Sequence, residues 1–150
     1  MYLPRIMLAA PASGSGKTLL TCGILMALKN RGLHTASFKC GPDYIDPLFH
    51  QEVIGIPARN LDTFFTDREM TKYLFGRTAI QAEISVLEGV MGYYDGAGGN
   101  TTLASSYELA CVTDTPVILI VNAKGMSLSV VAVIQGFLDY RKENQIAGVI

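Results

Sequence analysis

A strand-like run, a glycine-rich turn and a helical pattern follow one another near the start of this chain and constrain its fold most. Residues 5–10 read RIMLAA, a short apolar run, and residues 11–18 read PASGSGKT. The second stretch matches the phosphate-binding loop pattern G-x-x-x-x-G-K-[ST], except that Pro11 stands at the first glycine. Apolar residues recur at helical spacing across 17–30. This order predicts the first βα unit of a nucleotide-binding α/β protein.

The glycine-rich loop supplies the chemistry of a triphosphate site. Gly14 and Gly16, on either side of Ser15, let backbone N–H groups turn toward phosphate oxygens. Lys17 can reach the β and γ phosphates, and the Thr18 hydroxyl can bind Mg²⁺. The helix that starts here adds its N-terminal partial charge. We therefore expect these five residues to bind ATP with Mg²⁺; the alternative is a plain glycine turn between a strand and a helix.

Strand and helix signals alternate along the rest of the chain. The expected strands span 5–10, 34–39, 83–89, 116–123 and 146–150, and the expected helices span 17–30, 67–78, 103–112 and 127–142. A turn-rich segment after the second strand is expected to open a short helix near Pro47. Such alternation predicts a mostly parallel sheet with helices on both faces, which is the three-layer sandwich of a P-loop NTPase-like α/β fold.

Composition bounds the partners and the location of the protein. The 150 residues suffice for one domain, and 49% apolar with 17% charged residues is typical of an ordered core. A net charge of -1 without a basic run argues against nucleic acid or an anionic membrane as the main partner. No apolar stretch reaches the roughly 18 residues of a membrane span.

The three cysteines and the two chain ends carry further expectations. The cysteines form no C-x-x-C pair, and their odd number without a secretory signal indicates a reducing cytoplasm. Cys22 and Cys111 lie in helical patterns and are predicted to be small core residues. The last residues, IAGVI, form an apolar strand. We therefore expect residues 1–150 to be one ATP-binding domain of a longer protein.

A second chemistry-bearing stretch, KCGPDYIDP, directly follows the second expected strand. Asp43 and Asp46 are three residues apart, so both can face one side of a turn or helix. Lys39 leaves the end of the strand beside them. Carboxylates in this place can bind Mg²⁺ directly or through water. The alternative is structural, with Asp46 as a helix N-cap before Pro47.

A third stretch, VLEGVMGYYDG, has four apolar or acidic strand positions ending at Glu88, where many phosphate-loop enzymes place an acid that faces the metal. Asp95 closes this stretch, and the glycines between the two acids allow close backbone approach. The alternative is an exposed glycine loop in which Tyr93 and Tyr94 only pack.

All three stretches follow strands, and ligands of open parallel sheets bind at the carboxyl ends of the strands. We therefore expect the three loops to line one crevice. His34 and His50 have no comparable support and are assigned to the surface or to packing.

Taken together, several stretches resemble one known family. They are APASGSGKT, FKCGPDYIDPLFH, RNLD (59–62), EGVMGYYDG and NAKGMSLSVVAVIQGF (122–137). The chain resembles the cobyrinic acid a,c-diamide synthase family over essentially its whole length. The resemblance implies a ligase that uses ATP and Mg²⁺ to convert the a and c acetate side chains of a corrinoid to amides through an acyl phosphate. The nitrogen would come from glutamine, hydrolysed by a separate C-terminal glutaminase domain.

The resemblance also assigns roles by position. Lys17 and Thr18 match the ATP-binding loop, Lys39, Asp43, Asp46 and Asp95 are implied to be catalytic, Thr18, Asp46 and Glu88 to bind the metal, and Tyr44 to face the substrate. Tyr93 departs from the leucine more common in the family. The three cysteines lack the Gly-x-Cys-x-Gly surroundings of a nucleophile turn, so we expect no glutamine hydrolysis by these residues.

Three other interpretations remain open from the sequence. The first is a sister enzyme that amidates hydrogenobyrinic acid or nickel sirohydrochlorin with the same motifs. The second is a partitioning-type ATPase that dimerises, although Ala12 stands where that class carries an extra lysine. The third is a nucleotide-binding fragment without catalytic activity.

Overall fold

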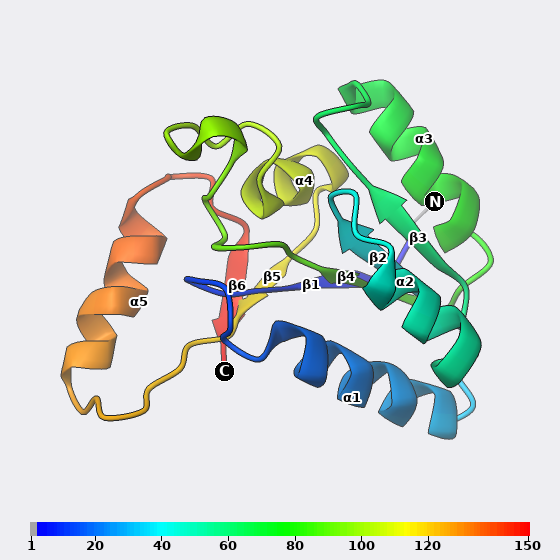
Figure 1. Cartoon of the computed structure of the whole chain (residues 1–150), viewed down its shortest axis with the longest axis horizontal. Coiled ribbons are helices and arrows are strands. Elements are labelled where there is room, and N and C mark those ends of the chain that lie inside the picture. Colours follow the sequence, from blue (N-terminus) through cyan, green and yellow to red (C-terminus); the bar gives the residue numbers. More distant parts are fainter. Residues whose placement is uncertain (1–2) are drawn as a thin grey trace.

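The protein forms one parallel sheet in the computed structural model, which describes residues 3–150 (Figure 1). In chain order the strands of this part are β1 (Arg5–Ala9), β2 (Thr35–Cys40), β3 (Ala58–Leu61), β4 (Ile84–Glu88), β5 (Val117–Leu119) and β6 (Ile146–Val149). Their order across the sheet is β3-β2-β4-β1-β5-β6, and every neighbouring pair is parallel. The predicted mostly parallel α/β fold is confirmed.

Helices cover both faces of the sheet and complete the three layers. Helix α1 (Lys17–Asn30) lies along one face, and α3 (Arg68–Ala79) and α4 (Ser106–Thr113) lie on the other (Figure 1). Successive residues of a strand point to opposite faces, so β1 places Met7 in the core under α3 and α4 and Leu8 in the core under α1. Because both faces are buried, the central strands read as continuous apolar runs.

Local sequence signals explain where the helices begin. Asp67 caps α3 by accepting a hydrogen bond from the Met70 backbone N–H, and Ser105 caps α4 by accepting one from Glu108. Helix α1 begins directly after Gly16 and ends before Gly32, whose φ of 80° is left-handed. The glycine allows the turn that stops the helix at little cost.

The segment between β2 and α3 differs from the prediction. It contains the short helix α2 (Ile45–Phe49), which continues into a π-helical turn, η1 (His50–Ile54). The edge strand β3 was not predicted at all. It has only four residues, of which Ala58 and Leu61 are buried and the two between them are exposed, so no clear strand period was visible.

Smaller differences concern the second half and the cysteines. Strand β5 stops at Leu119, although a strand was predicted to continue to 123. The prediction that Cys22 and Cys111 are core residues is wrong, because both are half-buried, whereas Cys40 is buried. Each lies at the edge of a helix face, where periodicity alone does not separate core from rim.

Helix α5 (Ser129–Asp139) contacts the rest of the fold through aromatic rings. Tyr94 stacks on Phe137 with ring centroids 5.4 Å apart, and its hydroxyl donates to the Phe137 carbonyl at 2.8 Å. Buried Tyr93 packs beside Tyr94. These tyrosines belong to a glycine-rich loop, residues 89–105, that includes the short 3₁₀ turn η2 (Ala97–Gly99) and lies beside α5 (Figure 1). Among the described residues, no helix has the length and apolarity needed to cross a membrane.

Candidate active site

The phosphate loop joins the end of β1 to the start of α1. Gly14 and Gly16 have φ values of 74° and 86°, a left-handed conformation that side chains disfavour. The Ser15 hydroxyl donates to the Ala12 carbonyl at 2.9 Å and closes the loop. The Lys17 amine donates to the carbonyl of Ala12 at 3.1 Å. The loop therefore has the curled backbone that a phosphate-binding turn requires.

Lys17 also ties the phosphate loop to the glycine-rich loop. Its amine donates to the Met91 carbonyl at 2.7 Å, and Met91 itself has a positive φ of 49°. Burial lowers the pKa of Lys17, and the charge of nearby Lys39 lowers it further. Bound phosphates would oppose both effects, since negative charge favours the ammonium form.

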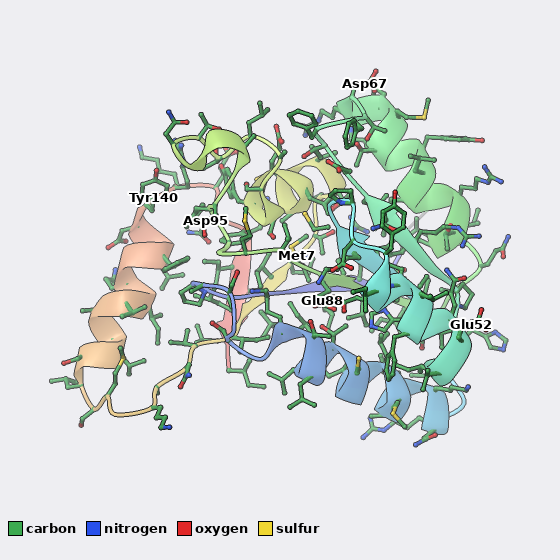
Figure 2. The ribbon with its side chains drawn as sticks, in the orientation of Figure 1. Met7, Glu52, Asp67, Glu88, Asp95 and Tyr140 are labelled. Atoms are coloured by element: carbon green, nitrogen blue, oxygen red, sulfur yellow. The ribbon has the colours of Figure 1, made fainter. Side chains whose placement is uncertain are left out.

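A four-residue cluster, which we call the Lys39 cluster, lies next to this loop and comprises Thr18, Lys39, Asp46 and Glu88. The Lys39 amine is 2.5 Å from Asp46 Oδ2 and 2.7 Å from Glu88 Oε1. The Thr18 hydroxyl donates to Glu88 Oε1 at 2.6 Å and lies 3.5 Å from Asp46 Oδ2. The cluster joins α1, β2, α2 and β4, and Figure 2 shows Glu88 in the interior near α1 and α2.

Strand pairing explains how Lys39 and Glu88 meet. They are register partners on β2 and β4, so their side chains leave neighbouring strands on the same face. Asp46 reaches them from the second residue of α2. The interpretation of Asp46 as a helix N-cap is wrong, because the N-cap position is Tyr44 and the capping-type bond comes from Asp43 Oδ1, which accepts from the Ile45 N–H at 2.9 Å.

The protonation preferences in the cluster follow from burial and from Lys39. Burial raises the pKa of Glu88, which is 0% exposed, and the ion pair with Lys39 offsets this only in part. Burial also acts on Asp46, but the hydrogen bond and charge of Lys39 outweigh it and lower the pKa of that carboxyl. Burial lowers the pKa of Lys39, and its bonds to Asp46 and Glu88 more than compensate, so the pKa is raised.

The residues of the cluster fit a magnesium ion. Glu88 Oε2 is buried and has no hydrogen-bond partner, so one carboxylate oxygen beside the phosphate loop is left to bind a ligand. Within residues 3–150 no three His, Cys, Asp or Glu side chains gather as a metal cluster. Mg²⁺ does not need one, since it keeps several waters and binds through one or two carboxylates and phosphate oxygens. Thr18, Asp46 and Glu88 would be the protein ligands, directly or through water.

A cavity of about 440 Å³ brings two of the three predicted loops fully together. Its lining includes Gly14, Lys17, Thr18, Lys39, Asp43, Asp46, Glu88 and Met91. Asp43 Oδ2 is 3.7 Å from the Lys39 amine and belongs to the rim of this cluster. A crevice shared by the loops after β1, β2 and β4 was predicted, and the cavity has these three loops in its wall.

Asp95 and Tyr44 lie outside the Lys39 cluster. Asp95 is exposed, and its Oδ2 accepts a hydrogen bond from the Gly92 N–H at 2.9 Å. A side chain at Gly92 would clash with Asp95 and with the Pro11 carbonyl, so glycine is required there. Figure 2 shows Asp95 apart from Glu88, toward α5. Tyr44 is 84% exposed and makes no contact with the cluster. Tyr93 and Tyr94 do pack, as the structural alternative for this loop expected.

Two residues near the site had no assigned role in the sequence. Asn60 on β3 donates from Nδ2 to the carbonyls of Gly41 and Asp43, at 2.7 and 2.6 Å, and so fixes the loop that carries Asp43. His50 is fully buried, with Nδ1 at 2.8 Å from Ser37 Oγ, and burial lowers the pKa of its imidazole. This agrees with the packing role expected for His50. Its position one helical turn after Asp46 was the only signal for its place behind the site.

Comparison with known proteins decides the family. Residues 6–150 match the family model described as "CobQ/CobB/MinD/ParA nucleotide binding domain". The chain belongs to this family. It is 48% identical over 147 residues to the cobyrinate a,c-diamide synthase of Listeria innocua, covering 97% of this chain and 32% of that protein. It is 45% identical to the hydrogenobyrinate a,c-diamide synthase of Streptomyces coelicolor, covering 99% and 30%.

These relatives confirm the resemblance to the diamide synthases for the domain in hand, and the chain spans about a third of their length. Among solved structures, the signal recognition particle receptor FtsY of Elizabethkingia anophelis aligns with a TM-score of 0.51 at 16% identity, over 99% of this chain and 57% of that one. At this identity the likeness concerns the fold alone, and it agrees with the predicted P-loop NTPase-like architecture.

Proposed function

We propose that this chain is the ATP-binding synthetase domain of an enzyme that amidates the a and c acetate side chains of a corrinoid. The observation that carries the proposal is the Lys39 cluster beside the phosphate loop, in which a buried carboxylate keeps one oxygen unpartnered. A merely structural ion pair would not require Thr18, the last residue of the phosphate loop, to donate to that same carboxylate. The relatives' names supply the substrate class, and the site supplies the chemistry.

The triphosphate would activate a substrate carboxylate. A carboxylate is a poor acceptor for ammonia because its oxygen does not leave. Attack of a carboxylate oxygen on the γ phosphorus forms an acyl phosphate and releases ADP; attack of ammonia on the acyl carbon then releases phosphate and leaves the amide. Both steps gain from groups that stabilise negative charge on the phosphoryl oxygens.

Each residue of the site has a place in this scheme. Lys17 and the backbone N–H groups of the phosphate loop would hold the β and γ phosphates. Bound Mg²⁺ would supply additional positive charge at the phosphate oxygens, held by Thr18, Asp46 and Glu88. Lys39 would keep the two acids ionised and in place, and its charge would oppose repulsion between them and an anionic substrate.

The acids outside the cluster would act on the substrate side. Asp43 lies at the rim of the phosphate cavity, and Asp95 is presented by the glycine-rich loop. Either carboxylate can bind an ammonium ion or accept a proton from ammonia as it attacks. Tyr44, exposed on the loop before α2, would contact the substrate.

Ammonia would come from glutamine through a glutaminase domain in the same polypeptide, since these residues offer no nucleophile turn for that reaction. Amidation tests the proposal directly. The full-length polypeptide is incubated with ATP, Mg²⁺ and ammonium or glutamine, with cobyrinic and hydrogenobyrinic acids as separate substrates, and the products are followed by mass spectrometry. We expect a diamide and one ADP for each amide formed. If neither acid is amidated while ATP is still hydrolysed, the proposal fails.

A second test uses Lys17→Ala. The variant lacks the amine placed to reach the phosphates, so we expect amide formation to fall by at least about a hundredfold. Arg31→Ala, at the exposed end of α1, serves as the matched control because it removes a cation from the same helix without touching the loop. Normal turnover by Lys17→Ala would contradict the assignment of the phosphate site.

A further inference from the structure

A second cavity, about 740 Å³ in volume, adjoins the phosphate cavity. Its wall is mainly apolar and includes Phe64, Phe65, Val90 and Met91. Val90 and Met91 line both cavities, so one wall separates them. The segment between β3 and α3, which carries the two phenylalanines, and the glycine-rich loop both lie on the α3 and α4 side of the sheet (Figure 1). Volumes of roughly 300–1,000 Å³ are typical of small-molecule sites.

The two phenylalanines are exposed and are held in place. Phe64 is 61% exposed and Phe65 is 73% exposed, and their rings meet edge to face with centroids 5.1 Å apart. Asp62 fixes the turn before them, because its Oδ1 accepts from the Phe64 N–H at 2.8 Å and its carbonyl accepts from the Thr66 N–H at 3.1 Å. Thr63 anchors the turn to α4 by donating to Glu108 at 2.8 Å. The rings are therefore presented on an ordered turn.

A single exposed aromatic ring on a protein surface needs no explanation, but this arrangement does. Two neighbouring rings and the half-exposed Met91 side chain line one hollow that shares a wall with a phosphate site. Met91 is also fixed, since its carbonyl accepts from Lys17. Apolar groups held open to water beside a reaction site are typical of a surface that a ligand covers.

The charge of the cavity indicates which part of a ligand it takes. Among the described residues, those that line it include no Lys, Arg or His. Its two charged groups are the carboxylates of Asp62 and Asp95, which would repel a carboxylate of the ligand. The cavity therefore suits an uncharged, apolar and flat portion of a molecule whose charged arms point elsewhere.

We propose that this cavity binds the apolar face of the tetrapyrrole ring, with Phe64, Phe65 and Met91 as the residues that position it. This inference rests on the proposed function and adds the site of the ring. With the ring on these side chains, an acetate arm has only the Val90–Met91 wall to pass before it reaches the phosphate cavity. Repulsion by Asp62 and Asp95 would keep the other carboxylate arms out of the hollow and so favour poses in which one arm enters the phosphate site.

The test compares aromatic and truncated variants in the full-length polypeptide. Phe64→Ala, Phe65→Ala and the double variant are assayed for amide formation with the tetrapyrrole acid varied at saturating ATP, and then with ATP varied. We expect the KM for the tetrapyrrole to rise about tenfold in the double variant, with kcat and the KM for ATP within about twofold of the wild type. Phe65→Tyr keeps an aromatic face and should retain most of the affinity. Tyr73→Ala removes a ring that is 62% exposed on α3, away from this cavity, and serves as the control.

Binding without turnover gives an independent readout. Titration of the tetrapyrrole acid into wild-type and double-variant protein without ATP, followed by its absorption change, should show the same loss of affinity. An unchanged tetrapyrrole KM and affinity in a double variant that melts like the wild type would overturn the inference and leave the proposed function standing. A parallel rise in the KM for ATP would also overturn it, because the rings would then support the nucleotide site. If the wild-type protein amidates no tetrapyrrole acid, the proposed function fails and the inference fails with it.

Discussion

The Lys39 cluster and the Asp95 loop offer similar residues in opposite physical states. Each has acidic groups after a strand and glycines close by. In the cluster, Glu88 is fully buried and Lys39 is 5% exposed, and the residues come from four elements locked by short ion pairs. Asp95 is exposed and held through one hydrogen bond to the backbone of its own loop.

The difference separates two tasks. A buried ion network loses much energy when one member is removed, so it can hold phosphate and metal in one fixed geometry. An exposed acid on a glycine-flanked loop contributes little to stability and can follow a substrate that must be amidated at two positions. The comparison predicts that changes in the cluster disturb fold and chemistry together, whereas changes at Asp95 disturb chemistry alone.

The largest effect is expected for Lys39→Ala. The change leaves Glu88 and Asp46 close together without their cation in a buried place, which we expect to cost about 3 kcal/mol or more of folding free energy. Amide formation should fall by at least about a thousandfold, because nucleotide and metal positioning are lost together. Thermal melting of the full-length polypeptide and the amidation assay measure the two effects.

A double variant isolates the cause of this instability. Lys39→Ala combined with Glu88→Gln removes the uncompensated buried charge and should regain part of the melting temperature without regaining activity. If Lys39→Ala alone melts like the wild type, the cluster is not the preformed site that this comparison assumes.

A smaller effect is expected for Glu88→Gln. The amide keeps the shape of the side chain and removes a charge whose burial is unfavourable, as the raised pKa of Glu88 indicates, so the melting temperature should change by only a few degrees. Activity should fall by about a hundredfold, and more Mg²⁺ should be needed for half-maximal rate. Asp43→Asn, at the rim of the same cluster, is the matched control and should shift the Mg²⁺ requirement less. An unchanged Mg²⁺ requirement in Glu88→Gln would make Glu88 a structural acid.

The acid side of the stability profile should report Asp46. Its pKa lies below the usual 3.8 in the folded protein, so its ionised form is favoured by folding. The stabilisation is therefore present above the unfolded pKa and is lost as the pH falls through 3.8 toward the folded value. The difference in melting temperature between wild type and Asp46→Asn should be largest near about pH 6 and shrink below about pH 4. A difference independent of pH would show that the ion pair with Lys39 is not its origin.

Sequence periodicity predicted much of the fold because its signals are local. The run RIMLAA, the loop PASGSGKT and the helical pattern after it each identify an element without reference to any other. Strand β3 escaped because four residues at the sheet edge, half of them exposed, leave too short a pattern. Helix α2 was expected only as a short helix near Pro47, and its π-helical continuation has no signal that periodicity detects.

The site was predictable to the level of loops but not of contacts. Placing Lys39, Asp46 and Glu88 at strand ends was enough to expect them at one edge of the sheet. That Lys39 and Glu88 are register partners, and that Lys17 donates to the Met91 carbonyl, depends on how strands far apart in sequence align. The Phe64 and Phe65 cavity was missed because an apolar pair in a loop is recognised as a site only once its neighbours are known.

The smallest effect on the molecule, and the most specific effect on the reaction, is expected for Asp95→Asn. An asparagine oxygen can still accept from the Gly92 N–H, so the loop should keep its shape and the melting temperature should stay within about a degree of the wild type. ATP affinity should also persist, because Asp95 makes no contact with the phosphate loop cluster. Amide formation should fall by about tenfold, since the amide cannot take a proton from ammonia or balance the charge of an ammonium ion. Because the loop must serve two acetate positions, we expect the monoamide to accumulate before the diamide, which a time course by mass spectrometry would reveal. Equal losses of ATP affinity and amide formation would instead make Asp95 part of the nucleotide site, and the contrast between a fixed cluster and an adaptable loop would not hold.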